Sequence, residues 1–544
     1  MQKKIVIVGG VAGGASTAAR LRRLDEFAEI ILFEKDTYIS FANCGLPYHI
    51  GGVIAERKEL IVQSPEAMRA RFRIDVRTHS RVTSVDTARG IVRVESAERG
   101  AYEESYDALV LCPGAEPIAL GPKGIERVFT LRNIDDTDRI NHFVSARGVR
   151  TAAILGGGFI GVEMAENLRE RGVTVRLIEA MDHILAPFDI EMAAIVHKEF
   201  RAHGVELTLS RKVTALEDAG DSVRITLDDG SVFETDMVVS AIGVRPATEF
   251  LKDSGIVLGP RGHIITDAYM RTNVPNVYAA GDAALITDYV TGLAAAIPLA
   301  GPANRQARTV ADSIMGLDRP YHGAQGSAIV KVFGLTAAVT GANESALKRA
   351  GIPYHKVYTH PFSHATYYPG AVQIDCKLLF HPDGRILGCQ MIGAEGVDKR
   401  LDVVATALRL KAKVTDLCDL ELAYAPPYSS AKDPVNMLGY VAQNVLEGVS
   451  SLTDFEEAEA YDPASAILLD VRTPREFERG HLPGAVNIPV DALRDRLQEL
   501  DPNKEILEYC QVGVRGHTAQ RILSQHGFKV KNVTGGYKTY SIKE

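Results

Sequence analysis

The sequence has few cysteines for its length and no long hydrophobic run. Six cysteines among 544 residues do not make a disulfide framework, so we expect a chain that works in the reducing cytoplasm. The uncharged stretch at residues 290–303 is too short to cross a bilayer and contains glycine and proline. Lys3 and Lys4 lead directly into the first apolar run, so no signal peptide is expected.

The sequence also lacks a surplus of positive charge. Its formal net charge is −8 and it has no basic stripe, so neither a nucleic acid nor an anionic membrane is expected as a partner. No spacing of histidine, cysteine or acidic residues is typical of a metal site. What the sequence does have is a hydrophobic content of 46%, which at this length indicates several globular domains with proper cores.

A nucleotide-binding pattern opens the sequence. A strand is expected at 3–8, a glycine-rich turn follows, and a helix is expected at 15–23. A second strand at 29–33 ends on Glu34, an acid at the spacing that accepts hydrogen bonds from a ribose. Val11 replaces the second glycine of the usual motif, so a tight turn without a ligand is the alternative. The candidate cofactor contacts are Gly9, Gly10, Ala12, Gly13, Gly14 and Glu34.

A second and complete glycine fingerprint lies further along the chain. A strand is expected at 151–155, the loop occupies 156–161, and a helix runs through Arg171. The next strand ends on Glu179, which would accept from a ribose 2′-hydroxyl and repel a 2′-phosphate. This acid favours NADH over NADPH. The candidate contacts are Gly156, Gly158, Phe159, Ile160, Gly161 and Glu179.

A third segment supports a flavin. A strand is expected to end at Gly281-Asp282, where the acid can reach a ribityl chain and a following helix can face the ring. Linkers at 111–115 and 241–246 are interpreted as crossings between two folds. Together these residues resemble the flavoproteins with two dinucleotide-binding domains, over about residues 1–445. The resemblance implies FAD and NAD(P)H. It also implies cofactor contacts at Lys35, Ser40, Asn43, Val82, Pro113, Gly114, Gly243 and Pro298.

Cys44 has no cysteine partner in its motif. Related reductases with an internal redox pair have a second cysteine five residues later, where this sequence has His49. The stretch 40–48 resembles the single-cysteine branch of coenzyme A disulfide reductases, NADH oxidases and NADH peroxidases. The oxidase and peroxidase members carry a histidine in the first glycine loop, and Ala12 here argues against peroxide chemistry. A helix N-terminus at 43–45 is expected to lower the pKa of the thiol. A buried loop cysteine is the alternative.

The coenzyme A branch implies a binding helix for its substrate. Arg20 and Arg23 are three residues apart and so lie on one helix face. By themselves they would indicate a solvated face, but the resemblance implies that this helix binds coenzyme A. Ser40 and Asn43 are implied as further substrate contacts.

The same branch uses two tyrosines from the other subunit near the reactive thiol. The matching positions here are Tyr367 and Tyr424, with Tyr368 and Tyr428 as alternatives. If these tyrosines cross the interface, the protein is an obligate homodimer. Interface packing with one satisfied hydrogen bond is the alternative interpretation.

A separate module follows a linker at 447–451. A strand at 506–509 delivers Cys510, and a helix is expected near residue 516. The C-x4-R loop between Cys510 and Arg515 turns backbone N–H groups toward the sulfur and favours an anionic sulfur species. This segment resembles a rhodanese domain, in which the loop cysteine carries a persulfide. A phosphatase is the alternative, although phosphatase loops are generally one residue longer.

The expected fold class is α/β. It has two Rossmann-like domains as in glutathione reductase, an α+β dimerisation domain and an α/β rhodanese domain. The FAD-binding domain is discontinuous, at 1–115 and 240–322. The NAD(P)H-binding domain occupies 116–239, the dimerisation domain 323–446 and the rhodanese domain 452–544. The remaining cysteines are expected to be buried small residues: Cys112, Cys376, Cys389 and Cys418.

The whole chain resembles coenzyme A disulfide reductase–rhodanese fusions, also described as coenzyme A persulfide or polysulfide reductases. The resemblance implies that Cys44 attacks the sulfur substrate and that Cys510 moves sulfane sulfur. An NADH oxidase or peroxidase with an accessory rhodanese is one alternative. A sulfur-carrier or redox-sensing protein is another. The sequence leaves open whether the substrate is a coenzyme A disulfide, a persulfide or polysulfide, and in which direction Cys510 transfers sulfur.

Overall fold

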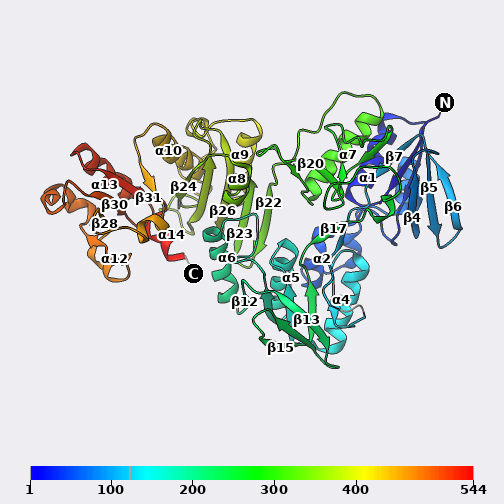
Figure 1. Ribbon diagram of the computed structural model, residues 1–544, viewed down its shortest axis with the longest axis horizontal. Coiled ribbons are helices and arrows are strands. Elements are labelled where there is room, and N and C mark those ends of the chain that lie inside the picture. The colour runs from blue at the N-terminus through cyan, green and yellow to red at the C-terminus, as the bar shows by residue number, and fades with distance from the viewer. Residues whose placement is uncertain (1, 122–123, 543–544) are drawn as a thin grey trace. The chain divides into compact units, whose positions relative to one another are not determined.

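The computed structural model describes residues 2–121 and 124–542, and its contacts divide the chain into two compact units. Unit 1 comprises Met1–Leu185 and His203–Gly326. Unit 2 comprises Ala186–Ala202 and Ser327–Glu544. Figure 1 colours the ribbon along the sequence, so that the return of the chain to unit 1 can be followed. Among the described residues, no helix is both long and apolar enough to cross a membrane.

The first glycine loop belongs to a five-stranded parallel sheet in unit 1, with strand order β19-β7-β1-β2-β3. Its central strands are almost continuously apolar and buried, as expected for a parallel sheet that is covered on both faces. Helices α1 and α7 pack against each other beside this sheet. The bounds are β1 Lys4–Val8, α1 Ala12–Leu24, β2 Glu29–Phe33, β3 Asp75–Arg77, β7 Ala108–Leu111, β19 Val277–Ala279 and α7 Ala300–Ile314.

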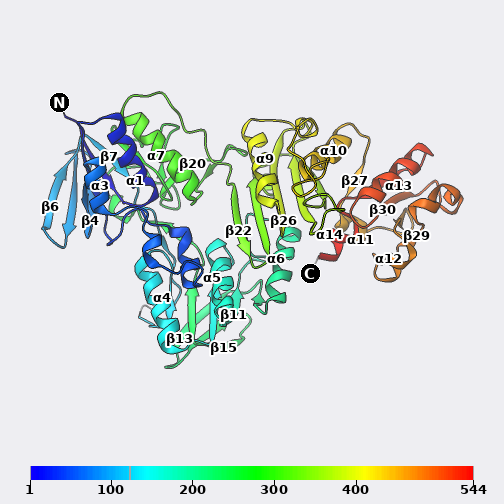
Figure 2. The same ribbon diagram turned by 180° about the vertical axis from the view of Figure 1, so that it is seen from behind.

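Smaller elements complete this part of unit 1. A three-stranded antiparallel sheet β4-β5-β6 stands near α3, as Figure 2 shows from behind. The short helices that follow β2 carry the Cys44 motif. The bounds are η1 Asn43–Gly45, α2 Leu46–Ile50, η2 Arg57–Leu60, α3 Pro65–Phe72, β4 Ser80–Asp86, β5 Ile91–Ser96, β6 Gly100–Ser105, η3 Glu249–Leu251, β18 Ile264–Ile265, β20 Ala284–Thr287 and β21 Ala294–Ala295.

A second five-stranded sheet in unit 1 repeats the first, with order β12-β11-β10-β16-β9. In both sheets the glycine loop follows the central strand and opens a helix, here α5. The two crossings pair with each other as strands β8 and β17. The bounds are β8 Ala115–Pro117, β9 Val128–Phe129, α4 Ile134–Arg147, β10 Thr151–Leu155, α5 Phe159–Glu170, β11 Thr174–Ile178, β12 Glu206–Thr208, β13 Val213–Asp218, β14 Val223–Leu227, β15 Val232–Thr235, β16 Met237–Ser240 and β17 Val244–Pro246.

Unit 2 begins with a five-stranded antiparallel sheet of order β22-β23-β26-β25-β24. Helix α9 packs on β23 and β26, and β25 and β26 are buried along their whole length. Cys376 and Cys389 lie within these two strands, where burial raises the pKa of both thiols. The bounds are α6 Ile190–Ala202, β22 Ala328–Val332, β23 Leu335–Gly341, α8 Glu344–Ala350, β24 His355–Thr359, β25 Ile374–Phe380, β26 Ile386–Gly393, α9 Val397–Arg409, η4 Asp416–Cys418 and α10 Pro434–Leu446.

Helix α6 is fixed to this sheet by the buried Lys377. The Lys377 ammonium contacts the carboxylates of Asp189 at 2.7 Å and Glu344 at 2.5 Å, and also that of Glu191. These three carboxylates lie close enough together to suggest a cation site, but the lysine already supplies the positive charge. The cluster therefore has a structural role. Residues 186–202, which the sequence assigns to the NAD(P)H-binding domain, are grouped with unit 2.

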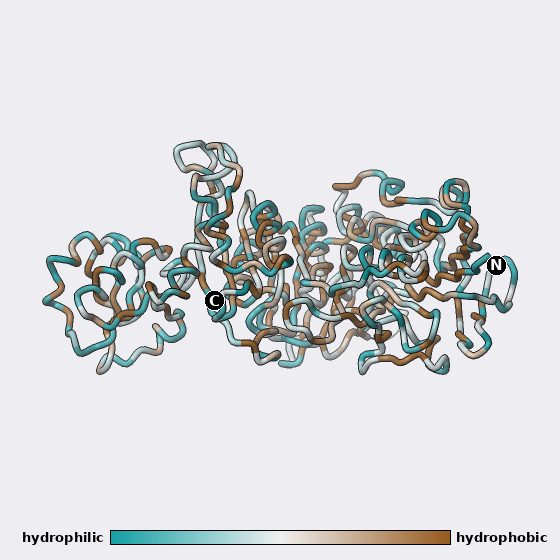
Figure 3. Tube along the Cα trace, turned by 90° about the horizontal axis from the view of Figure 1, so that it is seen from above, coloured by the Kyte–Doolittle hydropathy of each residue, from teal (hydrophilic) through white to brown (hydrophobic). Residues whose placement is uncertain are grey.

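The end of the chain forms a five-stranded parallel sheet of order β27-β31-β30-β28-β29. Its interior is apolar, and Figure 3 shows brown stretches of chain inside it and teal stretches in its loops. The bounds are β27 Leu452–Thr453, α11 Phe455–Glu459, β28 Ala466–Asp470, α12 Pro474–Glu478, β29 Val486–Asn487, η5 Val490–Asp495, η6 Leu497–Glu499, β30 Glu505–Tyr509, α13 Val514–Gln525, β31 Val530–Val533 and α14 Gly536–Ile542.

Buried polar contacts connect this last sheet to the antiparallel sheet of unit 2. The Nδ1 of His360 donates to the Asp375 carboxylate at 2.5 Å, and its Nε2 lies 3.2 Å from the carbonyl oxygen of Gly535. Lys538 on α14 forms an ion pair with the same Asp375 at 2.5 Å. The backbone N–H of Tyr537 in turn donates to the carbonyl of Cys510 at 2.8 Å. Helix α14 thus connects β24 and β25 to the Cys510 loop.

One expected element is wrong. The segment after Gly281-Asp282 turns into strand β20, and the next helix, α7, begins only at Ala300. The strand that precedes this motif, β19, ends at Ala279, before Gly281. The turn follows from the positive φ of Gly281, 82°, and from Gln306 of α7, whose side-chain oxygen accepts the Gly281 N–H at 2.7 Å.

Candidate functional site

The first glycine loop is shaped by close backbone approaches. Gly9 has a φ of 96°, and a Cβ on Gly14 would lie 1.8 Å from the carbonyl oxygen of Gly9. No side chain caps the N-terminus of α1, so its first N–H groups are available for an anion such as a pyrophosphate. Glu34 is buried and accepts the N–H of Gly10 at 2.8 Å, which holds its carboxylate against the loop. Burial raises the pKa of Glu34.

The second glycine loop has the same construction. Gly156 has a φ of 99°, and a Cβ on Gly161 would lie 1.9 Å from the Gly156 carbonyl oxygen. Gly158 caps α5 without a side-chain hydrogen bond and has open space where a Cβ would be. Glu179 accepts the N–H groups of Gly157 and Met181 at 2.6 and 2.8 Å. Phe159 is half-buried and Ile160 is exposed at the first turn of the helix. Both loops therefore fit a dinucleotide phosphate.

The other expected cofactor contacts are spread over unit 1. Lys35 forms an ion pair with Glu116 at 3.0 Å, and the N–H of Ser40 donates to the Gly10 carbonyl at 2.9 Å. Val82 is buried in the apolar core, so its side chain is a packing residue. The remaining positions lie in turns beside the loops or in the crossings: Ala12 and Gly13 at the start of α1, Asn43 in η1, Pro113 and Gly114 before β8, Gly243 before β17, Asp282 after Gly281, and Pro298 before α7.

Cys44 is an exposed, free thiol in the 3-10 turn η1, directly before α2. Partial burial of the sulfur raises the pKa of this thiol, and the negative charges of Glu163 and Asp282 raise it further. The pKa shift is therefore opposite to the lowering expected from a helix N-terminus, because burial of the sulfur is the largest cause and the two carboxylates add to it. His49 stands where other reductases have a second cysteine, and its ring nitrogen bonds the Ile54 carbonyl at 2.6 Å.

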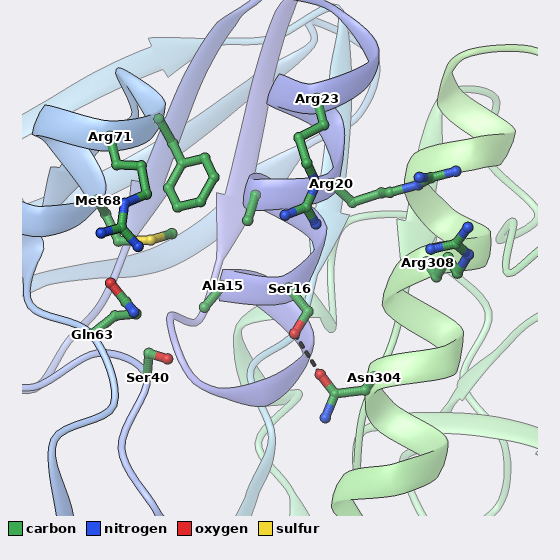
Figure 4. A pocket seen from close by; sticks show the side chains of 12 residues that line it. Ala15, Ser16, Arg20, Arg23, Ser40, Gln63, Met68, Arg71, Asn304 and Arg308 are labelled. Atoms are coloured by element: carbon green, nitrogen blue, oxygen red, sulfur yellow. Dashed lines mark hydrogen bonds between the residues drawn. The ribbon is translucent and has the colours of Figure 1, made fainter. Parts of the chain in front are cut away.

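A pocket of about 380 Å³ opens beside α1 (Figure 4). Arg20 and Arg23 both line it, as the helix-face argument predicts. Arg20 is partly neutralised by Asp312, which its guanidinium contacts at 2.7 Å. Ser16 bonds Asn304 across the pocket at 2.5 Å. The full lining is Ala15, Ser16, Ala19, Arg20, Arg23, Ser40, Gln63, Met68, Arg71, Phe72, Asn304 and Arg308.

Four arginines give this pocket its character. Arg20 and Arg23 come from α1, Arg71 from α3 and Arg308 from α7, and Figure 4 shows their side chains around the same space. Against these cations the lining offers hydroxyl and amide groups but no carboxylate. Guanidinium groups bind phosphate through paired N–H donors, so the pocket suits a ligand with several phosphates. Ser40 lines the pocket and lies a few residues before Cys44 in the sequence.

The two tyrosines of the sequence prediction meet in unit 2. The hydroxyl oxygens of Tyr367 and Tyr424 lie 2.8 Å apart and share a hydrogen bond. Both rings are exposed, at 74% and 47%, so they lie on the surface of the subunit. The hydrogen bond from Tyr424 raises the pKa of Tyr367. Tyr368 and Tyr428 are also exposed on these two loops.

The Cys510 loop lies between β30 and α13. The sulfur of Cys510 is buried and accepts the backbone N–H of Gly513 at 3.1 Å, and Gly513 adopts a φ of 105°. No side chain caps α13, so further N–H groups face the loop. Arg515 points to Glu476 instead of the sulfur, with contacts of 2.6 and 2.7 Å. This pairing lowers the pKa of Glu476 to about 2.

Family models match nearly the whole chain. A pyridine nucleotide-disulphide oxidoreductase model matches residues 3–307, the dimerisation domain of the same family matches 327–434, and a rhodanese-like domain matches 454–543. The chain belongs to the pyridine nucleotide-disulphide oxidoreductase family. It carries a rhodanese-like domain at its end. Membership implies FAD and a pyridine nucleotide as cofactors, which the two uncapped glycine loops fit.

Relatives within this family agree over long spans. A coenzyme A disulfide reductase of Staphylococcus aureus is 39% identical over 443 residues, which is 81% of this chain and 100% of that protein. The crystal structure of reduced Bacillus anthracis CoADR-RHD is 49% identical, covers 100% of this chain and 98% of its own, and has a TM-score of 0.97. A NAD-dependent persulfide reductase from A. fulgidus is 36% identical, covers 99% and 100%, and has a TM-score of 0.91.

The sequence motifs of this oxidoreductase did not predict every residue of the site. Arg71 and Arg308 lie far from each other and from Cys44 along the chain, and only the packing of α3 and α7 beside α1 brings them together. A weak signal was present, because Asn304 and Arg308 are four residues apart and therefore share a helix face. Glu163 was also missed, although an acid within the apolar stretch Val162–Ala165 is unusual.

Proposed function

We propose that this chain is an NAD(P)H-dependent flavoprotein that reduces coenzyme A disulfide, coenzyme A persulfide or polysulfide. Cys44 forms the mixed disulfide with the substrate, and the fused rhodanese domain moves sulfane sulfur through Cys510. The observation that carries this proposal is the free, exposed thiol of Cys44 together with a pocket that contains four arginines. Ser40, which lies a few residues before Cys44 in the sequence, lines that pocket. A thiol without an internal partner must close its disulfide with a sulfur compound brought from outside.

The pocket supports coenzyme A as that compound. Coenzyme A is a polyanion, with a pyrophosphate and a ribose phosphate at the end opposite its thiol. Arg23, Arg71 and Arg308 supply cations for these phosphates, while Ser40 lies between the pocket and Cys44. The substrate therefore stretches from the arginines to the sulfur, with Asn43 beside the thiol. Inorganic polysulfide would use the same cysteine without filling the pocket.

The chemistry divides between the cofactors and the side chains. FAD, when bound, would supply the route by which the electrons of NAD(P)H reach the sulfur–sulfur bond. The residues of the chain orient and bind: the N-terminus of α1 holds the pyrophosphate of one dinucleotide and that of α5 holds the other. Glu179 favours NADH, because a carboxylate repels a 2′-phosphate. Cys44 attacks the outer substrate as a thiolate, and the leaving sulfur group takes the electron pair of the broken bond.

Two other functions remain alternatives. An NADH oxidase or peroxidase would need a proton-donating side chain over Cys44 from the first glycine loop, and Ala12 offers a methyl group there. A sulfur carrier would rely on Cys510 alone and would leave the arginine pocket without a purpose. The reductase accounts for both cysteines and for the pocket, in a cytoplasmic setting that keeps all six cysteines as free thiols.

The test is anaerobic NADH oxidation by wild-type, Cys44→Ser and Cys510→Ser proteins. Coenzyme A persulfide and coenzyme A disulfide are supplied separately, and sulfide is measured. We expect Cys44→Ser to lose turnover with both substrates. Cys510→Ser should retain it with free persulfide, because the rhodanese then only feeds the flavin-side thiol. NADH oxidation by Cys44→Ser at the wild-type rate would refute the proposal.

The tyrosine pair gives a test of the homodimer. We propose that Tyr367 and Tyr424 serve the Cys44 site of the partner subunit, where their hydroxyls donate to the departing thiolate. A Cys44→Ser protein and a Tyr367→Phe, Tyr424→Phe protein are each expected to be slow. Mixed dimers of the two contain one intact site and should regain up to half of the wild-type activity per dimer. No regain in verified mixed dimers would mean that the tyrosines serve their own subunit.

A further inference from the structure

A short segment of the rhodanese-like domain is bonded to the antiparallel sheet of unit 2. Residues 534–538, called the connector below, run from the end of β31 into the first turn of α14. The Thr534 hydroxyl oxygen accepts the backbone N–H of Tyr358 on β24 at 3.1 Å. The Gly535 carbonyl oxygen lies 3.2 Å from Nε2 of His360, directly after the same strand. The start of the connector is therefore fixed to a strand outside the rhodanese-like domain.

The other end of the connector holds the beginning of the Cys510 loop. The backbone N–H of Tyr537 donates to the Cys510 carbonyl at 2.8 Å, and that of Lys538 donates to the Gln511 carbonyl at 2.9 Å. Gly536 allows this close approach because it has no side chain: a Cβ there would lie 2.5 Å from the Cys510 carbonyl oxygen. Backbone N–H groups of the connector thus fix the first two carbonyl groups of the loop.

These contacts determine the direction of the N–H groups in the loop. In a trans peptide the C=O and the N–H of one unit point to opposite sides. Because the carbonyls of Cys510 and Gln511 face the connector, the N–H groups of Gln511 and Val512 point away from it. The next N–H, that of Gly513, donates to the Cys510 sulfur at 3.1 Å. The connector therefore orients the peptide units from which the loop presents its donors to an anionic sulfur.

An ion pair holds the connector from the side of the sheet. The Lys538 ammonium contacts the Asp375 carboxylate on β25 at 2.5 Å and the side-chain oxygen of Gln373 at 3.1 Å. The same carboxylate accepts from Nδ1 of His360 at 2.5 Å. Burial opposes a charge on Asp375, but His360 and Lys538 hold the pKa of its carboxyl below the usual range. Lys538 thus bonds the sheet with its side chain and the Cys510 loop with its backbone.

We propose that Lys538 and Asp375 are positioning residues for Cys510: their ion pair places the connector, and the connector places the loop that carries the sulfur. Both residues act through the connector and not by contact with the sulfur. The antiparallel sheet, which matches the dimerisation domain of the family, then takes part in the sulfur chemistry of the rhodanese-like domain. This inference rests on the proposed function, in which Cys510 carries sulfane sulfur.

The uptake of sulfur makes this positioning measurable. The Cys510 thiolate forms a bond to the outer sulfur of a donor persulfide, the sulfur–sulfur bond of the donor breaks, and the donor thiolate leaves with the electron pair of that bond. The product is a persulfide on Cys510, whose outer sulfur carries the negative charge. Correctly oriented N–H groups stabilise this anion, so a loop whose peptide units have turned holds less persulfide at equilibrium.

The test measures this persulfide in the full-length, FAD-containing protein without NADH. Wild type, Lys538→Met, Asp375→Asn and the double variant are incubated with coenzyme A persulfide and trapped with iodoacetamide, and the Cys510 peptide is quantified by mass spectrometry. Each single variant should have a ratio of persulfide to thiol about 3–10 times lower than wild type, the effect of about one hydrogen bond. Because the two residues act as one pair, the double variant should lose no more than either single variant.

Three comparisons separate positioning from a general loosening of the fold. Lys538→Arg keeps the cation and should restore most of the wild-type level. Lys531→Met breaks an ion pair with Glu457 inside the rhodanese-like domain, at 2.7 Å, and is the matched control that should follow wild type. Cys376 and Cys389 are buried in β25 and β26 and should stay unalkylated in every variant. If one single variant does not fold, the other decides together with the Lys531 control.

The outcomes distinguish this inference from the proposed function. Wild-type persulfide levels in the folded Lys538→Met and Asp375→Asn proteins would overturn the inference, as would a double variant that multiplies the two single effects. Alkylation of Cys376 in step with the loss of persulfide would also overturn it, because the pair would then only stabilise the fold. Absence of persulfide on wild-type Cys510 would refute the carrier function itself, and this inference with it.

Discussion

Replacement of Glu508 by glutamine is expected to stabilise the rhodanese domain at neutral pH. Glu508 on β30 is fully buried, and neither of its carboxylate oxygens has a hydrogen-bond partner among the described residues. Burial, with the nearby Cys510, raises the pKa of Glu508 well above its ordinary value. The side chain lies beside Asn532, since a Cβ on Gly516 would approach both: 2.8 Å from the Asn532 oxygen and 3.1 Å from a Glu508 oxygen.

The sign and size follow from proton linkage. The native protein keeps the proton while the unfolded chain loses it above pH 4.3, so stability falls as the pH rises from there toward the native pKa. Each pH unit over which the native carboxyl keeps a proton that the unfolded chain has lost costs at most about 1.4 kcal/mol of stability. At pH 5 the cost is about 1 kcal/mol. An amide keeps the shape and a donor for Asn532 and does not ionise.

Native-state hydrogen exchange of the full-length protein can measure this effect. Peptides that cover β30 and α13 are compared between wild type and Glu508→Gln at pH 5 and pH 7. The variant should gain about 1 kcal/mol in opening free energy at pH 5 and a larger amount at pH 7, the gain growing by at most about 1.4 kcal/mol per pH unit. Glu505→Gln, on the same strand with an ion pair to Lys531 at 3.6 Å, is the control and should gain nothing. A gain that does not grow with pH would refute the reasoning.

Three other predictions concern binding and transfer. Arg71→Ala and Arg308→Ala should each raise the KM for coenzyme A disulfide about tenfold, an effect that weakens in high salt; unchanged KM values in steady-state kinetics would contradict the arginine pocket. Glu179→Ala should reduce the preference for NADH, measured as the ratio of kcat/KM values for NADH and NADPH, by about tenfold; an unchanged ratio would locate the selectivity elsewhere. Glu476→Gln releases Arg515 and should slow sulfur transfer from thiosulfate severalfold, while NADH oxidation with free coenzyme A persulfide stays at the wild-type rate; equal slowing of both would indicate a general loss of folding.

Local features of the site could be predicted from the sequence because they depend on neighbours in the chain. A glycine loop, its preceding strand and the acid after the next strand lie within about thirty residues of one another, so their spacing alone determines their geometry. The Cys510 loop is equally local. Strand Glu29–Phe33 and strand Thr151–Leu155 accordingly begin and end at the expected residues.

Properties that depend on distant residues could not be predicted in this way. The ionisation of Cys44 was expected to be eased by a helix N-terminus, whereas Glu163 and Asp282, far along the chain, oppose it. The arginines of α3 and α7 joined those of α1 only through packing. The turn after Gly281 became a strand because Gln306 fixes it from α7. Motifs identify which chemical groups are present, and tertiary contacts determine their protonation and which other groups lie near them.

The contacts between helix α14 and the antiparallel sheet bear on how sulfur travels. The Cys510 loop is hydrogen-bonded to α14, and α14 contacts His360 and Asp375. The loop is therefore held to that sheet by side-chain contacts as well as by the linker at 447–451. The linker is bonded as well, since Arg521 holds the Val449 carbonyl at 2.7 Å. In a protein with a swinging arm, a carrier domain on a flexible linker moves between active sites. The Cys510 loop is thus held to the antiparallel sheet of unit 2, and we expect sulfane sulfur to reach or leave it on a small, mobile thiol such as coenzyme A.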